Sequence, residues 1–210
     1  AEGSCRIRCG NTQVLCTASV EDKPPRHVPE GEGWVTAEYS MLPRANRERS
    51  KRDIAKLKLS PRSAEIQRLV GRALRAAVDL EKLGPRTITV DCDVLQGDGG
   101  TRTASVTGGF VALSYALHKL VADGVLPEMP LTTCVAAVSA GIVGEEPMLD
   151  LCYEEDSHAQ VDLNCVMTGA GELVELQGTG EGRPFTIVGQ RALVELCAKG
   201  DRKSTRQNSS

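Results

Sequence analysis

The sequence predicts an α+β, or mixed α/β, fold in which helices pack against mixed β-sheets. Alternating polar and apolar residues, the pattern of strands, recur towards both ends of the chain, and two helical segments flank a strand in its middle. The predicted order is strands, helix, strand, helix, strands and a final helix, which is typical of layered α+β domains. At 210 residues the chain can form one large domain or two small ones with a sizeable core.

The first predicted elements are two strands of a hairpin, over residues 4–9 and 13–20, joined by the turn "CGNT". Proline, glycine and charged residues crowd residues 21–33, so we expect a loop there. Alternation returns over 34–42, which predicts a third strand.

The clearest predicted helix follows. Its apolar positions recur at helical spacing and are Ile66, Leu69, Val70, Ala73, Leu74, Ala77 and Val78. Ser60 is a suitable N-cap before Pro61, and Gly84-Pro85 is expected to end the helix. Arg62 then lies in the first turn, where the positive end of the helix dipole also favours an anion.

The second half predicts a strand over 87–96, a helix from about Thr103 and a final helix over 185–199. Between those helices we expect strands at 132–143, 148–153, 160–168 and 172–177, with a turn at Ser157-His158.

A cluster of positive charge occupies residues 44–62, with eight basic and two acidic residues, whereas the whole chain has a net charge of −3. Charged runs are usually solvated loops, but clustered Lys and Arg also bind phosphate backbones. Charge alone leaves these two interpretations about even.

The cysteines show no spacing typical of zinc sites. Most lie in apolar or alternating runs, which predicts small core residues of a reduced, cytoplasmic protein: Cys16, Cys92, Cys134, Cys152 and Cys165. No apolar run reaches 18 residues, so we expect no membrane partner.

The segment "QGDGGTRTAS" joins the strand at 87–96 to the next helix. It matches neither the dinucleotide fingerprint nor the P-loop. Gly100 and its neighbours nevertheless open a helix N-terminus, where backbone N–H groups, the Thr101 hydroxyl and the Arg102 guanidinium suit an anion. An ordinary strand-to-helix turn with a surface arginine is the alternative.

An acidic group surrounds the predicted turn at Ser157-His158. Asp156 falls at the end of one predicted strand, by the turn, and Asp162 lies early in the next, so a tight turn could bring both carboxylates to one end of the sheet. Two carboxylates with a substrate phosphate suit Mg²⁺. A polar turn is the alternative.

Five segments together closely resemble the ribonuclease PH family: "GWVTAEYSMLPR" (33–44), "EIQRLVGRALRAAVDL" (65–80), "DCDVLQGDGGTRTASVTGGFVAL" (91–113), "DLCYEEDSHAQVDLNCVMTG" (150–169) and "ELQGTGEG" (175–182). The resemblance implies a duplicated βαβα domain like that of ribosomal proteins. It also implies phosphorolytic 3′→5′ exoribonuclease action on tRNA precursors and other RNA 3′ ends, with nucleoside diphosphates released. The implied assembly is a homo-hexamer, a trimer of dimers.

The resemblance also assigns site residues by motif. Inorganic phosphate, the co-substrate, would be bound by Arg62, Gly100, Thr101 and Arg102. The acidic pair that is catalytic and associated with Mg²⁺ or Mn²⁺ would be Asp156 and Asp162. The arginines facing RNA would be Arg44, Arg49 and Arg52.

Residues 1–199 are therefore expected to form one ribonuclease PH-type exoribonuclease domain that lacks the basic start and first strand of the family. We expect residues 200–210 to be a disordered, non-native tail, because "DRKSTRQNSS" contains no apolar residue. Two other functions use the same features: a metal-dependent hydrolytic exoribonuclease, and a non-catalytic RNA-binding ring subunit.

Overall fold

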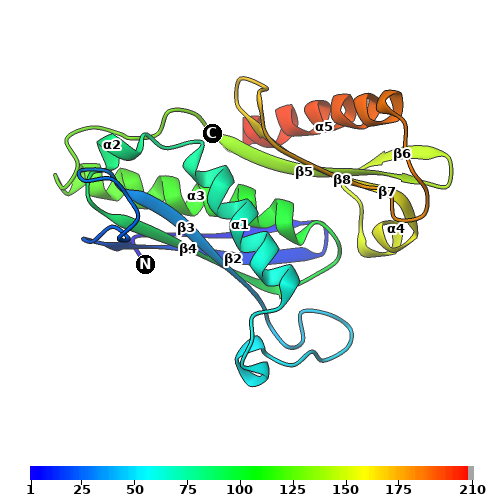
Figure 1. Cartoon of the computed structure of the whole chain (residues 1–210), viewed down its shortest axis with the longest axis horizontal. Coiled ribbons are helices and arrows are strands. Elements are labelled where there is room, and N and C mark those ends of the chain that lie inside the picture. The colour runs from blue at the N-terminus through cyan, green and yellow to red at the C-terminus, as the bar shows by residue number, and fades with distance from the viewer. Residues whose placement is uncertain (208–210) are drawn as a thin grey trace.

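The computed structural model describes residues 1–207, and their side chains except at positions 54, 56 and 201–207. Two four-stranded sheets with helices between and beside them make up the fold (Figure 1). The predicted mixed α/β class is confirmed.

The first sheet has the strand order β1-β2-β4-β3. Its strands are β1 (Gly3–Cys9), β2 (Thr12–Glu21), β3 (Trp34–Met41) and β4 (Thr87–Gln96). β1, β2 and β4 pair antiparallel, whereas β3 runs parallel to β4. The alternate residues of β4 that face the helices are buried, including Ile88, Val90 and Val94, as alternation in the sequence predicts.

The second sheet is antiparallel throughout and has the order β6-β5-β7-β8. Its strands are β5 (Val135–Val143), β6 (Glu146–Leu149), β7 (Ala159–Thr168) and β8 (Leu173–Thr179). The strands predicted at 132–143, 160–168 and 172–177 are therefore confirmed within a few residues, whereas the strand predicted at 148–153 was placed too late, since β6 ends at Leu149 and a helix begins at Tyr153.

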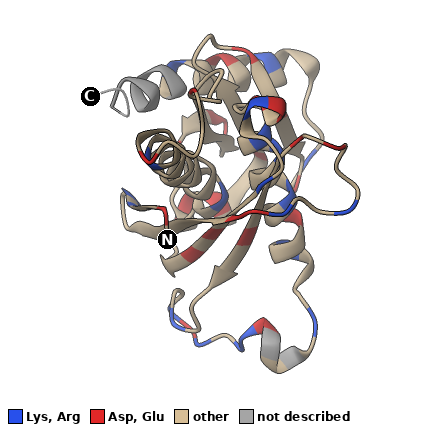
Figure 2. Ribbon diagram, turned by 90° about the vertical axis from the view of Figure 1, so that its left-hand side faces the viewer, with Lys and Arg blue, Asp and Glu red and all other residues tan. Residues whose placement is uncertain are grey.

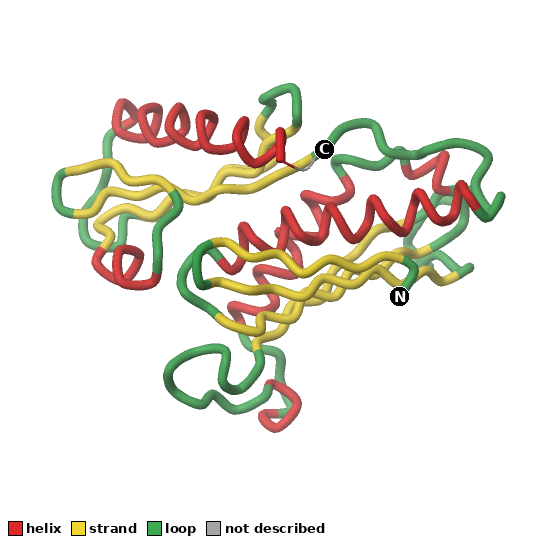
Figure 3. The backbone as a smooth tube through the Cα atoms, turned by 180° about the vertical axis from the view of Figure 1, so that it is seen from behind, coloured by secondary structure: helices red, strands yellow, loops and turns green. Residues whose placement is uncertain are grey.

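Helices α1 (Pro61–Arg75) and α3 (Thr101–Ala122) lie between the two sheets, and α5 (Ile187–Gln207) covers the outer side of the second sheet (Figures 1 and 3). The core of the first half includes Ile66, Leu74 and Leu113, all fully buried under the helices. A second cluster around Leu163 and Leu193 joins α5 to its sheet. This layering brings the beginning of α3 against the second sheet, where Arg102 contacts Gln177 of β8, whereas α1 meets β8 near its C-terminal end, through Arg72.

The helix predicted to run to Gly84 ends instead at Arg75, and a short helix α2 (Leu80–Leu83) follows. The chain between them is drawn into an isolated bridge between Val78 and Leu131. Asp79 then caps α2, since its carboxylate accepts hydrogen bonds from two backbone N–H groups of that helix. Contacts distant in sequence therefore override the local helical pattern.

The turn predicted at Ser157-His158 is also wrong, because this segment forms helix α4 (Tyr153–His158). The N–H of Cys152, the residue before the helix, donates to the Glu155 carboxylate, 2.9 Å away. This hydrogen bond caps the start of the helix. Asp156 therefore lies on a helix, not at the end of a strand.

A short helix before α1 and the last turns of α5 complete the fold. A single turn of 3₁₀-helix, η1 (Asp53–Lys56), lies between β3 and α1. At the other end α5 is helical to Gln207, beyond the predicted domain end at residue 199, and residues 208–210 lie outside the described part. The assignment of 200–210 as a non-native tail stays a prediction.

The predicted core role of the cysteines is confirmed for Cys16, Cys92 and Cys165, which are buried, whereas Cys134 and Cys152 are half-buried. The sulfur atoms of Cys16 and Cys92 lie 3.8 Å apart as thiols across β2 and β4. Among the described residues no helix is long and apolar enough to cross a membrane.

Candidate active site

The first part of the candidate site is the start of α3. Gly100 precedes the helix in the left-handed region, with φ of 56°, and no side chain caps the helix. The first turn also contains no acidic residue. The backbone N–H groups of a 22-residue helix therefore begin at an open N-terminus, which favours an anion.

Thr101 and Arg102 begin this helix, and both have defined partners. The buried Thr101 hydroxyl lies 2.9 Å from the phenol oxygen of Tyr39, at the end of β3. The Arg102 guanidinium donates to the Gln177 side-chain oxygen at 3.1 Å and lies 3.4 Å from the Glu65 carboxylate. The two polar side chains of the "GGTR" segment are therefore held by three other elements.

The start of α1 has the predicted N-cap. The Ser60 hydroxyl accepts a hydrogen bond from the Ser63 N–H at 3.0 Å, and Pro61 is the first helical residue. Arg62 in this turn is exposed, and its guanidinium lowers the pKa of the Tyr39 phenol through its charge and through hydrogen bonding.

Tyr39 brings the two predicted phosphate-binding arginines together. Burial raises the pKa of its phenol, while the hydrogen bond to Thr101 and the charges of Arg62 and Arg102 partly offset this rise. Because both arginines act on one buried phenol, the starts of α1 and α3 form a single cationic site. The sequence analysis did not identify Tyr39, because its position in the alternating pattern of β3 predicts only a buried strand residue.

The acidic pair lies beside Arg102. Asp162 is half-buried on β7, and its carboxylate accepts a hydrogen bond from Asn164 at 3.1 Å. Burial is the main cause that raises the pKa of Asp162, followed by repulsion from Asp156, whereas the charge of Arg102 lowers it. Asp156 is exposed on α4. The two carboxylates therefore lie close enough to interact, with Asp156 on a helix and not in a hairpin turn, and their catalytic and metal-binding roles stay predictions.

Residues 97–100, here called the glycine loop, join β4 to the start of α3 and also contact α4. Asp98 accepts hydrogen bonds from the Tyr153 N–H at 3.3 Å and from the Asn11 side chain at 2.9 Å. Gly99 has φ of 77°, and a Cβ there would overlap the backbone of Leu151. Asp98 and Gly99 thus fix α4 against the start of α3, a role that no local pattern in the sequence indicates.

The basic loop between β3 and α1 projects away from the sheets, as Figures 1 and 2 show. Arg44, Arg49 and Arg52 are all exposed on it. Its base is attached to the glycine loop, because the Gly97 N–H donates to the Ala45 carbonyl oxygen at 2.9 Å. The loop therefore begins beside the cationic site, although no hydrogen bond joins its three arginines to Arg62 or Arg102 in the described part of the chain.

A metal ion would have few protein ligands here. Among the side chains that the structure describes, no group of three or more from histidine, cysteine, aspartate and glutamate could hold a metal ion. The charge of Asp156 nevertheless raises the pKa of Asp162, which places the two carboxylates close enough to interact. Two carboxylates fit Mg²⁺, which retains water and binds substrate phosphates, better than a metal that needs a full protein cage.

The sequence matches two descriptions of one family in the expected order. Residues 1–117 match "3′ exoribonuclease family, domain 1", and residues 133–187 match domain 2 of that family. The chain belongs to the ribonuclease PH family. It is 57% identical over 201 residues to "Ribonuclease PH" of Moorella thermoacetica, covering 95% of this chain and 80% of that protein. The same name and identity apply to a protein of Bacillus pumilus, with 83% of that protein covered.

Solved structures confirm the ribonuclease PH fold. A chain of the "archaeoglobus fulgidus exosome with RNA bound to the active site" has a TM-score of 0.84, with 23% identity, 99% of this chain and 83% of that chain covered. Rice Rrp46 has a TM-score of 0.80 at 15% identity, with 100% of this chain and 88% of that one covered. These likenesses support the two-sheet fold, whereas the family assignment comes from the curated relatives.

Proposed function

We propose that this protein is a phosphorolytic 3′→5′ exoribonuclease, a tRNA nucleotidyltransferase, that trims tRNA precursors and releases nucleoside diphosphates. One observation carries the proposal: Arg62, Thr101 and Arg102 meet around Tyr39 at an open helix start, and Asp162 lies within reach of Arg102's charge. The family and its relatives named ribonuclease PH support the same activity.

In this proposal inorganic phosphate is bound by Arg62, Arg102, the Thr101 hydroxyl and the backbone at Gly100. Two guanidinium groups and an open helix N-terminus are suited to a dianion. A phosphate oxygen attacks the phosphorus of the last phosphodiester, and the bond from that phosphorus to the preceding 3′-oxygen breaks. The products are a nucleoside 5′-diphosphate and an RNA shortened by one nucleotide. Such transfers depend mainly on positioning and charge stabilisation.

Asp156 and Asp162 would hold Mg²⁺ or Mn²⁺, which supplies positive charge to the phosphoryl oxygens when bound. The leaving 3′-oxygen must also gain a proton. The alternative assignment makes one of the two carboxyl groups the general acid, and the raised pKa of Asp162 is compatible with that role. The two assignments are distinguished by metal dependence in variants of each residue.

The arginines Arg44, Arg49 and Arg52 are proposed to bind the RNA backbone. Their exposed positions on a projecting basic loop support this role, since phosphate contacts need accessible cations. We also propose a trimer-of-dimers hexamer. The fold shared with an archaeal exosome core (TM-score 0.79) supports a ring, and sedimentation at equilibrium tests it.

The proposal is tested by the phosphate dependence of RNA degradation. Wild-type protein should shorten a tRNA precursor only when inorganic phosphate is present, and Arg102→Ala should lose most of this stimulation. Lys119→Ala is the matched control, because Lys119 is a cation at the opposite end of the same helix, paired with Asp123. Degradation at an unchanged rate without phosphate would instead support the hydrolytic nuclease, and no degradation would support the non-catalytic ring subunit.

A further inference from the structure

A chain of hydrogen bonds outside the proposed phosphate contacts ends on Arg102. It begins at Arg72 on α1, where the guanidinium binds both oxygens of Glu175 on β8, at 2.8 and 2.6 Å. The Glu175 carboxylate accepts from the Gln177 side-chain amide at 3.1 Å. The Gln177 oxygen then accepts from Arg102 at 3.1 Å. The chain therefore joins α1, the edge of the second sheet and the start of α3.

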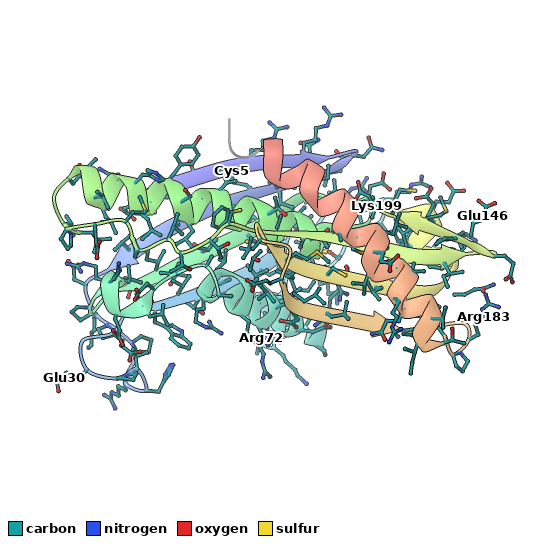
Figure 4. The ribbon with its side chains drawn as sticks, turned by 90° about the horizontal axis from the view of Figure 1, so that it is seen from above. Cys5, Glu30, Arg72, Glu146, Arg183 and Lys199 are labelled. Atoms are coloured by element: carbon teal, nitrogen blue, oxygen red, sulfur yellow. The ribbon has the colours of Figure 1, made fainter. Side chains whose placement is uncertain are left out.

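The geometry of β8 makes this chain possible. Glu175 and Gln177 are two residues apart on one strand, so both side chains point to the same face of the sheet. That face meets α1, and Arg72 lies where this helix passes the strands of the second sheet (Figure 4). Only 17% of the Glu175 side chain and 18% of the Arg102 side chain are exposed, whereas Arg72, at the outer end, is 43% exposed, so the links next to Arg102 are the ones shielded from water.

Each link fixes the orientation of the next. A carboxylate can only accept hydrogen bonds, so the amide nitrogen of Gln177 must face Glu175. Its carbonyl oxygen must then face Arg102, which can only donate. Because the paired hydrogen bonds from Arg72 hold Glu175, the amide cannot reverse without losing both contacts. Gln177 thus offers Arg102 an acceptor of fixed direction that carries no net charge.

The neutrality of the Gln177 side chain matters because a nearby carboxylate, that of Glu65, already competes for Arg102. Glu65 lies 3.4 Å from the same guanidinium nitrogen but is half-exposed, and the long distance makes this a weak pair. A carboxylate at position 177 would neutralise Arg102 permanently. A neutral acceptor instead holds the guanidinium in place and leaves its charge for a ligand.

We propose that Gln177 is a positioning residue that aims Arg102 at the bound inorganic phosphate, through the relay Arg72–Glu175–Gln177. This inference rests on the proposed function, since it takes phosphate as the ligand of Arg102. It adds that the second half of the chain contributes to phosphate affinity without touching phosphate. Loss of the relay lets Arg102 turn towards Glu65 and weakens phosphate binding while RNA binding is retained.

The test compares Gln177→Leu and Gln177→Glu with wild type and with Gln190→Leu, a matched control on α5. Steady-state assays give KM for phosphate and KM for RNA separately, and calorimetry measures the binding of inorganic phosphate directly. Loss of one hydrogen bond to a charged group predicts an approximately tenfold higher KM and Kd for phosphate in Gln177→Leu. KM for RNA should stay within about twofold, and Gln190→Leu should match wild type.

Gln177→Glu should weaken phosphate binding at least as much, because its carboxylate pairs with Arg102. In an Arg102→Ala background, Gln177→Leu should add no further loss of phosphate affinity, as expected for residues that act through one another. Melting temperatures identify any variant that is unfolded. If Gln177→Leu fails to fold, Gln177→Glu still tests the inference, because it keeps a polar side chain at this position.

Three results would overturn the inference: an unchanged phosphate Kd in both Gln177 variants, an equal rise in both KM values, or a full additional loss in the Arg102→Ala background. These results differ from failure of the proposed function. If wild-type protein degrades RNA without phosphate, the phosphorolytic assignment fails, whereas calorimetry with inorganic phosphate still decides the role of Gln177.

Discussion

Removal of one buried hydroxyl, in Tyr39→Phe, tests whether the starts of α1 and α3 form one site. Tyr39 is only 2% exposed, and its oxygen lies 2.9 Å from the Thr101 hydroxyl. A guanidinium only donates hydrogen bonds, so the phenol oxygen accepts from Arg62 and its own hydrogen is available to Thr101. The substitution removes both interactions and retains the ring.

The expected loss of stability in Tyr39→Phe follows from the polar groups that the substitution leaves without a partner. The buried Thr101 hydroxyl loses its partner, which costs about 1–3 kcal/mol. For a protein of this size each kcal/mol lowers Tm by about 2–4 °C, so a loss of ~2 kcal/mol predicts a fall of about 4–8 °C. Arg62 keeps its charge but loses a fixed direction, and we expect KM for phosphate to rise by about threefold to tenfold.

The assay combines calorimetric melting with phosphate kinetics at saturating RNA. Tyr115→Phe is the matched control, because Tyr115 lies on α3 with 61% of its surface exposed. If Tyr39→Phe behaved like Tyr115→Phe in both Tm and KM for phosphate, the phenol would not join the two helix starts, and the single cationic site would be refuted.

Three further predictions concern the acids and the glycine loop. Asp156→Asn should lower the pKa of Asp162, because it removes a repelling charge. The folded protein holds the Asp162 proton more tightly than the unfolded chain, so the free energy of unfolding falls as pH rises from the ordinary carboxyl pKa to the raised one. Urea titrations across this range should show a smaller fall in the variant, and an unchanged fall would contradict the coupling. Gly99→Ala should lower Tm and activity together, since a Cβ would strike Leu151 and φ is positive; a melting curve like that of wild type would exclude this close approach. Chelation of divalent cations should abolish RNA degradation and restoring Mg²⁺ should recover it, whereas full activity in the chelator would remove the metal from the proposal.

Much of the fold follows from periodic patterns in the sequence. β2 and β4 alternate between buried and partly exposed residues, and α1 begins at the predicted Ser60 cap. These elements were predictable because one face of each is buried and their caps are local. The first helix was predicted too long, since the bridge between Val78 and Leu131 has no local signal.

The candidate site was only partly predictable for the same reason. Arg62 and Arg102 could be proposed because each follows a recognisable helix start. Tyr39, Asp98 and Gln177 could not, because their partners lie 62, 55 and 75 residues away in the chain. Hydrogen bonds over such separations leave no periodicity, so only the folded structure reveals them.

In the proposed reaction, inorganic phosphate attacks the RNA end. The most direct measurement uses a tRNA precursor and radiolabelled inorganic phosphate, with separation of the released nucleotides. We expect nucleoside diphosphates that carry the label in their terminal phosphate. Unlabelled nucleoside monophosphates, released equally well without added phosphate, would contradict it.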